Sequence, residues 1–129
     1  MAPDKKRILV AEDTAALLFL IRVTLSEAGF DVFAVQDGHE AWAAISQSHF
    51  DLLVTDYQMP GMDGFELCRR MRHDPRLAQI PVLLLTAKMF EIDVSQVQEK
   101  LGLFTVLSKP FSPRELTRLV QERLGTCAV

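Results

Sequence analysis

The sequence has few of the features that mark secreted and membrane proteins. It has only two cysteines, Cys68 and Cys127, and no Cys-x-x-Cys motif in 129 residues. No apolar run approaches the ~18 residues of a membrane span, and the amino terminus lacks the apolar core of a signal peptide. We therefore expect a cytoplasmic protein with reduced thiols and no association with membranes.

The sequence also lacks an excess of basic residues and a glycine-rich phosphate loop. There are 14 Lys and Arg against 17 Asp and Glu, which gives a formal net charge of −3. Direct binding to nucleic acid is therefore not expected, because it usually relies on a basic surface stripe. Neither Gly-x-Gly-x-x-Gly nor a P-loop is present, which disfavours a dinucleotide-binding or ATP-binding fold.

Short apolar runs alternate with amphipathic stretches along the whole chain. The length suits one domain, so we take residues 1–129 as a single unit with its core at about 6–124. The predicted strands are 7–11, 30–35, 51–55, 81–86 and 104–107, and the predicted helices are 14–28, 38–48, 65–73, 88–101 and 113 onward. Continuous apolar strands in this alternation predict an α/β fold, with a doubly wound five-stranded parallel sheet covered on both faces.

Two helix starts and one charged helix face can be located from local patterns. Asp37 precedes the second predicted helix, and Ser112 with Glu115 forms a capping box before the last one. Three arginines of the third predicted helix are expected to form a solvated face (Arg69, Arg70 and Arg72).

Charged residues follow three of the predicted strands at the end where a parallel sheet places its binding site. Glu12 and Asp13 follow the first strand, Asp56 the third and Lys109 the fifth. Three carboxylates in one crevice repel one another and require a compensating charge. Mg²⁺ (or Mn²⁺) with carboxylate and water ligands provides it, and Lys109 adds an ammonium group.

A carboxylate can act as a covalent nucleophile toward phosphorus, and we predict that Asp56 is the phosphoacceptor. Asp13 is expected to bind the metal together with Asp56, and Glu12 either directly or through water. The backbone carbonyl of Gln58 is a further expected ligand. Lys109 and the Thr86 hydroxyl are expected to bind phosphoryl oxygens and to assist the transfer.

The spacing of these residues resembles the response regulator receiver family of two-component systems. The resemblance rests on five motifs in order: Glu12-Asp13, Asp56-x-x-Met59-Pro60-Gly61-Met62-Asp63-Gly64, Thr86-Ala87, Lys109-Pro110-Phe111 and Gly38-x-Glu40-Ala41. It implies a (βα)₅ flavodoxin-like, CheY-like fold and a cis bond between Lys109 and Pro110. It also implies phosphotransfer from a histidine kinase or a histidine phosphotransfer protein, slow self-dephosphorylation, and a switch in binding to a downstream protein. Such a protein is a phosphoacceptor and not a turnover enzyme.

Two features depart from the usual pattern of that family or stand out within it. Val106 occupies the position where an aromatic side chain often couples to the threonine. The first predicted helix is apolar on all sides, so part of it should remain exposed and bind a partner. We predict that Leu20, with Ala16 or Phe19, contacts the phosphodonor. The absence of acidic residues early in the fifth strand favours a monomer or a weak dimer.

Three other functions can be weighed against a phosphorylated receiver. A degenerate receiver, used only for protein binding, usually lacks an acidic-pocket residue or the lysine, and both are present here. A phosphatase of the haloacid dehalogenase type needs a second aspartate where Gln58 stands. A flavin binder needs a phosphate loop after the first strand, where Glu12 and Asp13 would repel phosphate.

Overall fold

The computed structural model describes residues 5–87, 99, 102 and 104–125. Five parallel strands form one sheet in the order β2-β1-β3-β4-β5. The strands are β1 (Arg7–Ala11), β2 (Asp31–Val35), β3 (Leu52–Asp56), β4 (Val82–Thr86) and β5 (Thr105–Ser108). The helices are α1 (Ala15–Glu27), α2 (Gly38–Gln47), α3 (Gly64–Arg72) and α5 (Pro113–Leu124).

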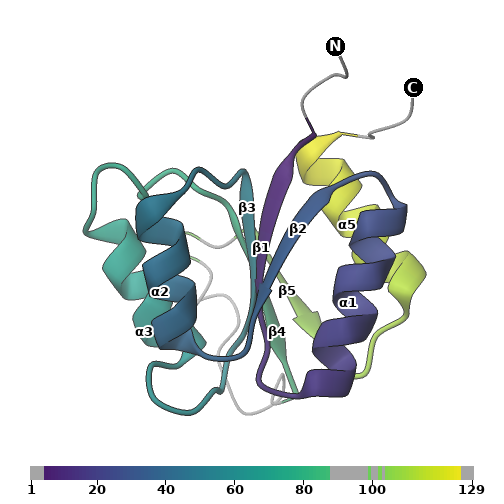
Figure 1. The fold of residues 1–129 in the computed structure, drawn as a ribbon, viewed down its shortest axis with the longest axis horizontal. Helices are drawn as coiled ribbons and strands as arrows, with labels where there is room; N and C mark the ends of the chain where they lie inside the picture. The colour runs from purple at the N-terminus through teal and green to yellow at the C-terminus, as the bar shows by residue number, and fades with distance from the viewer. Residues whose placement is uncertain (1–4, 88–98, 100–101, 103, 126–129) are drawn as a thin grey trace.

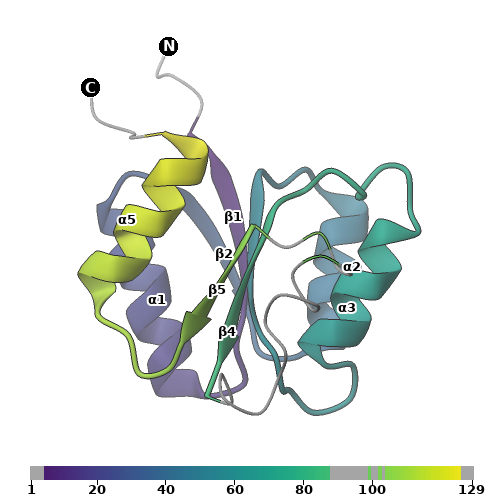
Figure 2. The same cartoon turned by 180° about the vertical axis from the view of Figure 1, so that it is seen from behind.

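Helices cover both faces of the sheet, as the sequence predicts. Figures 1 and 2 show α1 and α5 on one face and α2 and α3 on the other. The predicted helix at 88–101 falls on a stretch of which the structure describes only residue 99, so it lies outside the described residues. The α/β fold with five parallel strands is confirmed.

Each face of the sheet carries its own apolar core. Ile8, Val10 and Val54 point toward α1 and α5, whereas Leu9 and Leu53 point toward α2 and α3. Every residue of β3 and β4 is buried. Because both faces of these strands are covered, they are apolar almost throughout rather than alternating apolar with polar.

Three helices begin at side-chain caps. Asp37, Asp63 and Ser112 each accept a hydrogen bond from the backbone N–H three residues later, at 2.8, 2.8 and 3.1 Å. The two caps predicted from the sequence are therefore confirmed. α1 is different, since Thr14 makes no side-chain cap and its first turn has no acidic residue.

The third strand is displaced by one residue from its predicted bounds. It begins at Leu52 rather than Asp51 and extends to include Asp56. Asp51 instead accepts a hydrogen bond from the Arg7 backbone N–H at 2.8 Å through its carboxylate. As a result Asp56 belongs to the strand ladder, where it pairs with Leu85 of β4.

The prediction that Arg69, Arg70 and Arg72 form a solvated face on α3 was wrong at Arg72. Arg69 and Arg70 are exposed and pair with Glu66 at 2.6 and 3.1 Å. Arg72 is half-buried and donates to the backbone carbonyls of Ala78 and Ile80 at 2.8 and 2.9 Å. The helical spacing alone does not show that the chain after α3 returns beneath this side chain.

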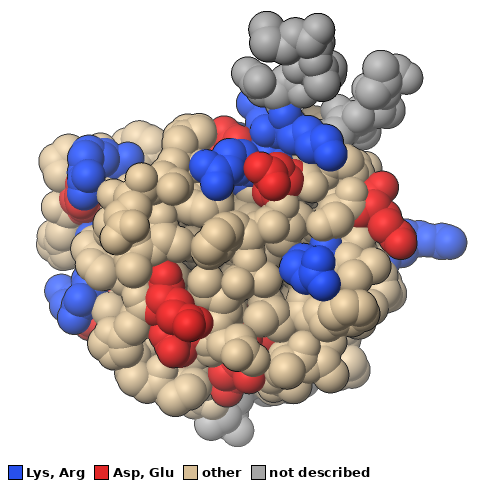
Figure 3. All heavy atoms as spheres, viewed as in Figure 1, with Lys and Arg blue, Asp and Glu red and all other residues tan. Residues whose placement is uncertain are grey.

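Charge on the surface is mixed in sign. Figure 3 shows basic and acidic side chains interspersed on the face seen in Figure 1, with acidic groups toward the end at which the strands finish. Among the described residues, no helix combines the length and apolar character needed to cross a membrane.

Candidate functional site

Three carboxylates meet where β1 and β3 end. The strands are neighbours and pair Ala11 with Thr55, so the residues that follow, Glu12 and Asp56, stand beside each other. Carboxylate oxygens of Glu12, Asp13 and Asp56 lie within 4.8 Å of one another. Glu12 and Asp56 are buried, with 0% and 6% of their surface exposed, whereas Asp13 is exposed. The site therefore has two buried acids and one that faces solvent.

Lys109 joins the two buried carboxylates. Its Nζ lies 2.7 Å from Glu12 Oε1 and 3.1 Å from Asp56 Oδ2. The lysine follows β5, and its backbone N–H donates to the Thr86 carbonyl at 2.8 Å, which places it at the same edge of the sheet. The Lys109–Pro110 peptide bond is cis. One ammonium group thus offsets part of the charge of two carboxylates.

The remaining negative charge alters the proton affinity of Asp56. Burial, followed by the charge of Glu12, raises the pKa of Asp56 from 3.8 to about 6, although Lys109 acts in the opposite direction. Burial lowers the pKa of Lys109, but its hydrogen bonds to Glu12 and Asp56 outweigh this effect and the pKa is raised. Lys109 therefore stays charged at neutral pH, while Asp56 is an acid whose charged form is held at a cost.

Glu12 is oriented by its own loop. Its Oε2 accepts a hydrogen bond from the Thr14 backbone N–H at 2.8 Å, while Oε1 faces Lys109. This contact with Thr14 was not predicted, and only the turn between β1 and α1 creates it. Each Glu12 oxygen keeps a second lone pair, so the side chain can still bind a cation or a water ligand.

Thr86 and Gln58 lie around the carboxylates. Thr86 is the last residue of β4 and is 2% exposed. It comes one position after Leu85, which pairs with Asp56 across the sheet. Gln58 is exposed, two residues beyond Asp56 in the loop that leads to α3. The sequence placed all the predicted site residues at this edge, and the described geometry brings Glu12, Asp13, Asp56 and Lys109 together.

The loop after Asp56 is closed by a glycine whose role the sequence analysis missed. The Gly64 backbone N–H donates to the Tyr57 carbonyl at 2.9 Å. A Cβ on Gly64 would collide with the Asp56 carbonyl oxygen. Met59 and Met62 are buried beneath this loop, with 7% and 4% exposed. Loop and helix therefore fit against the strand end only because residue 64 has no side chain.

The first turns of α1 carry apolar side chains that no other described element covers. Phe19 is 60% exposed and Leu20 42%, and Ala16 is also exposed, whereas Leu18 and Ile21 point into the core. The Arg22 guanidinium lies over the Phe19 ring, 5.3 Å from its centroid. The helix follows Glu12 and Asp13 directly, so this surface borders the acidic site.

Comparison with known proteins identifies relatives of this chain. The family model of the response regulator receiver domain matches residues 8–121. The chain is 37% identical over 120 residues to the DNA-binding response regulator MtrA of Mycobacterium tuberculosis, covering 93% of this chain and 51% of that protein. It is 36% identical over 116 residues to the alkaline phosphatase synthesis transcriptional regulatory protein PhoP of Bacillus subtilis, covering 90% and 47%. The chain spans about half the length of these relatives.

Solved structures share the whole fold. The chemotaxis response regulator CheY4 of Vibrio cholerae superposes with a TM-score of 0.84 at 29% identity, covering 92% of this chain and 98% of that one. The receiver domain of the sensor histidine kinase PA1611 from Pseudomonas aeruginosa gives 0.85 at 28% identity, covering 95% and 100%. That structure is described as having a magnesium ion coordinated in its active site cleft.

Proposed function

We propose that this chain, which belongs to the response regulator receiver domain family, accepts a phosphoryl group on Asp56 from a histidine kinase or a histidine phosphotransfer protein. The observation that carries the proposal is the contact of one ammonium group, Lys109 Nζ, with two buried carboxylates, Glu12 and Asp56. A buried acid cluster of this kind costs stability, and such costly arrangements are typical of functional sites. Phosphoryl transfer uses it, because that chemistry requires mainly position and charge.

The donor set fits a divalent cation of the Mg²⁺ type. Three carboxylates with oxygens within 4.8 Å of one another offer the hard oxygen ligands that this ion prefers. Asp13 and Asp56 would hold it, with the backbone carbonyl of Gln58, and with Glu12 either directly or through water. The magnesium reported for the PA1611 receiver supports this assignment. When bound, the ion neutralises the carboxylates and the phosphoryl oxygens that meet there.

The side chains of the site then have separate tasks. A carboxylate oxygen of Asp56 forms a bond to phosphorus as the bond from phosphorus to the donor nitrogen breaks, so the phosphoryl group passes from histidine to aspartate. Lys109 is proposed to stabilise the charge on a phosphoryl oxygen, and the Thr86 hydroxyl donates to another. Because Val106 replaces the usual aromatic, we expect the change in Thr86 to be transmitted by another route.

The phosphodonor is proposed to dock on α1. Its exposed apolar residues, Ala16, Phe19 and Leu20, lie in the helix that closely follows Glu12 and Asp13 in the chain. Neighbouring exposed apolar side chains beside a functional site favour a partner-binding surface. A downstream protein would bind the phosphorylated form, and the relatives named as DNA-binding regulators join such a domain to a longer chain.

A mass measurement tests the proposal. The protein is incubated with acetyl phosphate and Mg²⁺, and the intact mass is recorded with and without EDTA. We expect one phosphoryl adduct that requires the metal and is absent in Asp56→Asn. The control is Asp74→Asn, which removes a surface acid paired with Arg76 and leaves the adduct unchanged. An unmodified wild-type protein, with acetyl phosphate and with histidine donors, would instead indicate a degenerate receiver that acts only by binding proteins.

Lys109→Ala separates metal binding from the response to phosphorylation. We expect Mg²⁺ to bind still, because the carboxylates remain, and the change in partner binding on phosphorylation to be weaker. Calorimetric titration with Mg²⁺ measures the first property, and partner affinity with and without acetyl phosphate measures the second. An unaltered response would show that Lys109 has no part in switching.

A further inference from the structure

A second charged hollow lies at the other end of the sheet. It encloses about 340 Å³ and lies beside the amino ends of β4 and β5, where Pro81 and Phe104 precede the strands. The phosphoacceptor end is formed by the carboxyl ends of the same strands, so the two hollows are separated by the length of the sheet. The volume is at the lower end of the range for small-molecule pockets.

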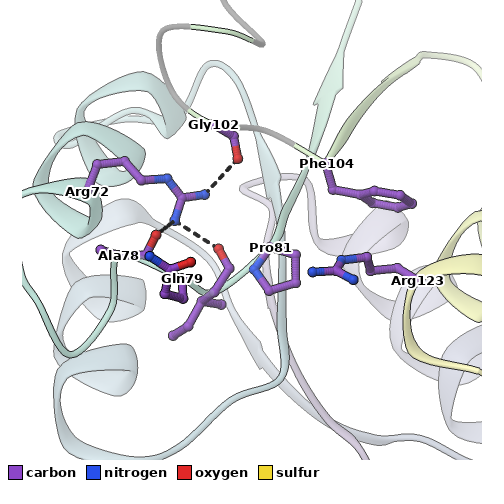
Figure 4. Close-up of a pocket in the computed structure, with 8 residues that line it drawn as sticks. Arg72, Ala78, Gln79, Pro81, Gly102, Phe104 and Arg123 are labelled. Atoms are coloured by element: carbon purple, nitrogen blue, oxygen red, sulfur yellow. Dashed lines mark hydrogen bonds between the residues drawn. The ribbon is translucent and has the colours of Figure 1, made fainter.

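Two guanidinium groups enter this hollow from opposite walls. Arg72 comes from the last residue of α3, and Arg123 from the last turn of α5. Figure 4 shows both pointing toward the space between them, with Pro81 and the ring of Phe104 alongside. Among the described residues, none of those that line the hollow is acidic. Two like charges that face one cavity favour an anion within it.

The two arginines differ in how they are held. Arg72 is fixed by backbone carbonyls, donating to Ala78 and Ile80 and to Gly102 at 3.1 Å. Its N–H groups are largely used in this way, so it contributes a fixed positive charge rather than free donors. Arg123 is exposed, and among the described residues it makes no ion pair. Its planar fork is therefore available to bind an oxyanion at two points.

The balance of charge in the hollow is positive. The carboxyl ends of α3 and α5 each bring roughly half a negative charge to this end of the molecule. Two guanidinium groups exceed that sum by about one unit, and the helix effect is confined to the last turn. The carbonyl groups around Arg72 are dipoles and do not cancel its charge. An anion is therefore attracted even with both helix ends nearby.

We propose that this hollow binds a phosphate monoester carried on a flat ring, the chemistry of a nucleoside monophosphate. A phosphate monoester carries about −1.5 to −2 charges at neutral pH and presents three oxygens, enough to contact Arg123 and face Arg72 at once. The ring would lie on the phenyl ring of Phe104, as bases stack on aromatic side chains. The proposal is independent of phosphorylation at Asp56.

Titration with adenosine monophosphate in EDTA tests the assignment, since removal of divalent metal excludes binding through the acidic site. Amide chemical shifts are followed by NMR, and affinity by calorimetry. We expect saturable binding in the millimolar range or tighter, with shifts at Gly102 and Phe104. Inorganic phosphate, which lacks the ring, and adenosine, which lacks the charge, should each bind at least about threefold more weakly.

Two arginine variants of the same helix decide where the nucleotide binds. Arg123→Gln should weaken binding about tenfold, because it removes the charge-assisted hydrogen bonds. Arg114→Gln removes an exposed arginine at the opposite end of α5 and should leave affinity unchanged. Both side chains are exposed, so neither variant should alter the melting temperature. Absence of saturable binding, equal binding of inorganic phosphate, or full affinity in Arg123→Gln would each overturn the proposal.

Discussion

The two ends of the sheet hold charge in different ways. At the carboxyl end, Glu12 and Asp56 are buried together with a single lysine between them, and burial raises the pKa of Asp56 to about 6. At the amino end, Arg72 and Asp51 are surrounded by groups that satisfy them, carbonyls in one case and N–H groups in the other. The acidic site therefore stores electrostatic repulsion between buried carboxylates, whereas Arg72 and Asp51 at the amino end have satisfied hydrogen bonds.

This difference predicts that removing a charged group changes the free energy of unfolding in opposite directions at the two ends. A neutral side chain in place of a buried carboxylate at the carboxyl end relieves repulsion, so the free energy of unfolding should rise. A neutral side chain at the amino end leaves hydrogen-bonding groups without partners, so the free energy of unfolding should fall. Repulsive arrangements of buried charge concentrate at sites where chemistry occurs, which supports a chemical role for the carboxyl end.

The largest change in stability is expected at Gly64, whose backbone lies against the Asp56 carbonyl group. Gly64→Ala places a methyl group against the Asp56 carbonyl oxygen, and the strand or the loop must move. We expect a loss of at least about 3 kcal/mol in the free energy of unfolding, together with slower phosphorylation. Urea unfolding and the acetyl phosphate assay measure these.

Gly125→Ala is the control for Gly64→Ala. A Cβ there meets nothing within 4 Å, although the backbone φ of 84° is still strained for alanine. We expect a loss of roughly 1 kcal/mol or less and normal phosphorylation. Gly64 does not have a positive φ, so a loss no larger than that of Gly125→Ala would contradict the contact with the Asp56 carbonyl as a source of instability.

Asp56→Asn should stabilise the protein at neutral pH in the absence of metal. A pKa raised from 3.8 to about 6 means that the ionised form costs the folded state about 3 kcal/mol. This shift already includes the opposing effect of Lys109, so we expect at most about 3 kcal/mol more stability. In the wild type, stability should increase as the pH falls from 7 toward 4, because the folded state takes up the proton first.

The pH dependence supplies the measurement and the control for Asp56→Asn. Unfolding in EDTA is followed between pH 4 and 7 for both proteins. The difference between them should shrink as the pH falls through about 6, where the wild-type carboxylate becomes protonated. A constant difference in unfolding free energy between pH 4 and 7 would mean that Asp56 does not cause the pH dependence.

Arg72→Gln tests the amino end of the sheet, where the hydrogen bonds of the charged side chain are satisfied. The substitution removes donors from the carbonyls of Ala78, Ile80 and Gly102, so we expect a loss of about 1–2 kcal/mol. Arg69→Gln is the matched control on the same helix, since it breaks only an exposed pair with Glu66 and should leave the free energy of unfolding nearly unchanged. Stabilisation by Arg72→Gln would contradict the comparison of the two ends.

The smallest effect is expected at Asp51, also at the amino end. Burial raises the pKa of Asp51, but hydrogen bonds from the Arg7 backbone and from His49 outweigh it and the pKa is lowered. Its contribution is therefore present above the unfolded pKa and is lost as the pH falls through the lower folded value. Asp51→Asn should cost about 0.5–1 kcal/mol at pH 7 and nothing at pH 2. Thermal melts at the two pH values show whether the sign is opposite to that of Asp56→Asn.

Much of the fold could be predicted from local patterns. The buried strands are almost wholly apolar and lie between recognisable caps, so their number and order were correct. The bounds were less accurate: the strand containing Asp56 is displaced by one residue, because hydrogen bonds between strands set its ends. The predicted solvated arginine face of α3 was wrong at Arg72, because the partners of this side chain lie in a segment that returns beneath the helix.

The sequence by itself determined the parallel α/β architecture and the edge of the sheet at which Asp56 and Lys109 lie, because hydrophobic periodicity and strand ends are local properties. Only the tertiary structure decided how these residues meet. The ammonium of Lys109 reaches Glu12 across 97 residues of chain, Gly64 must lack a side chain, and Arg72 and Arg123 face one hollow. Such contacts depend on how the elements pack in three dimensions, and the spacing of residues along the chain does not reveal that packing.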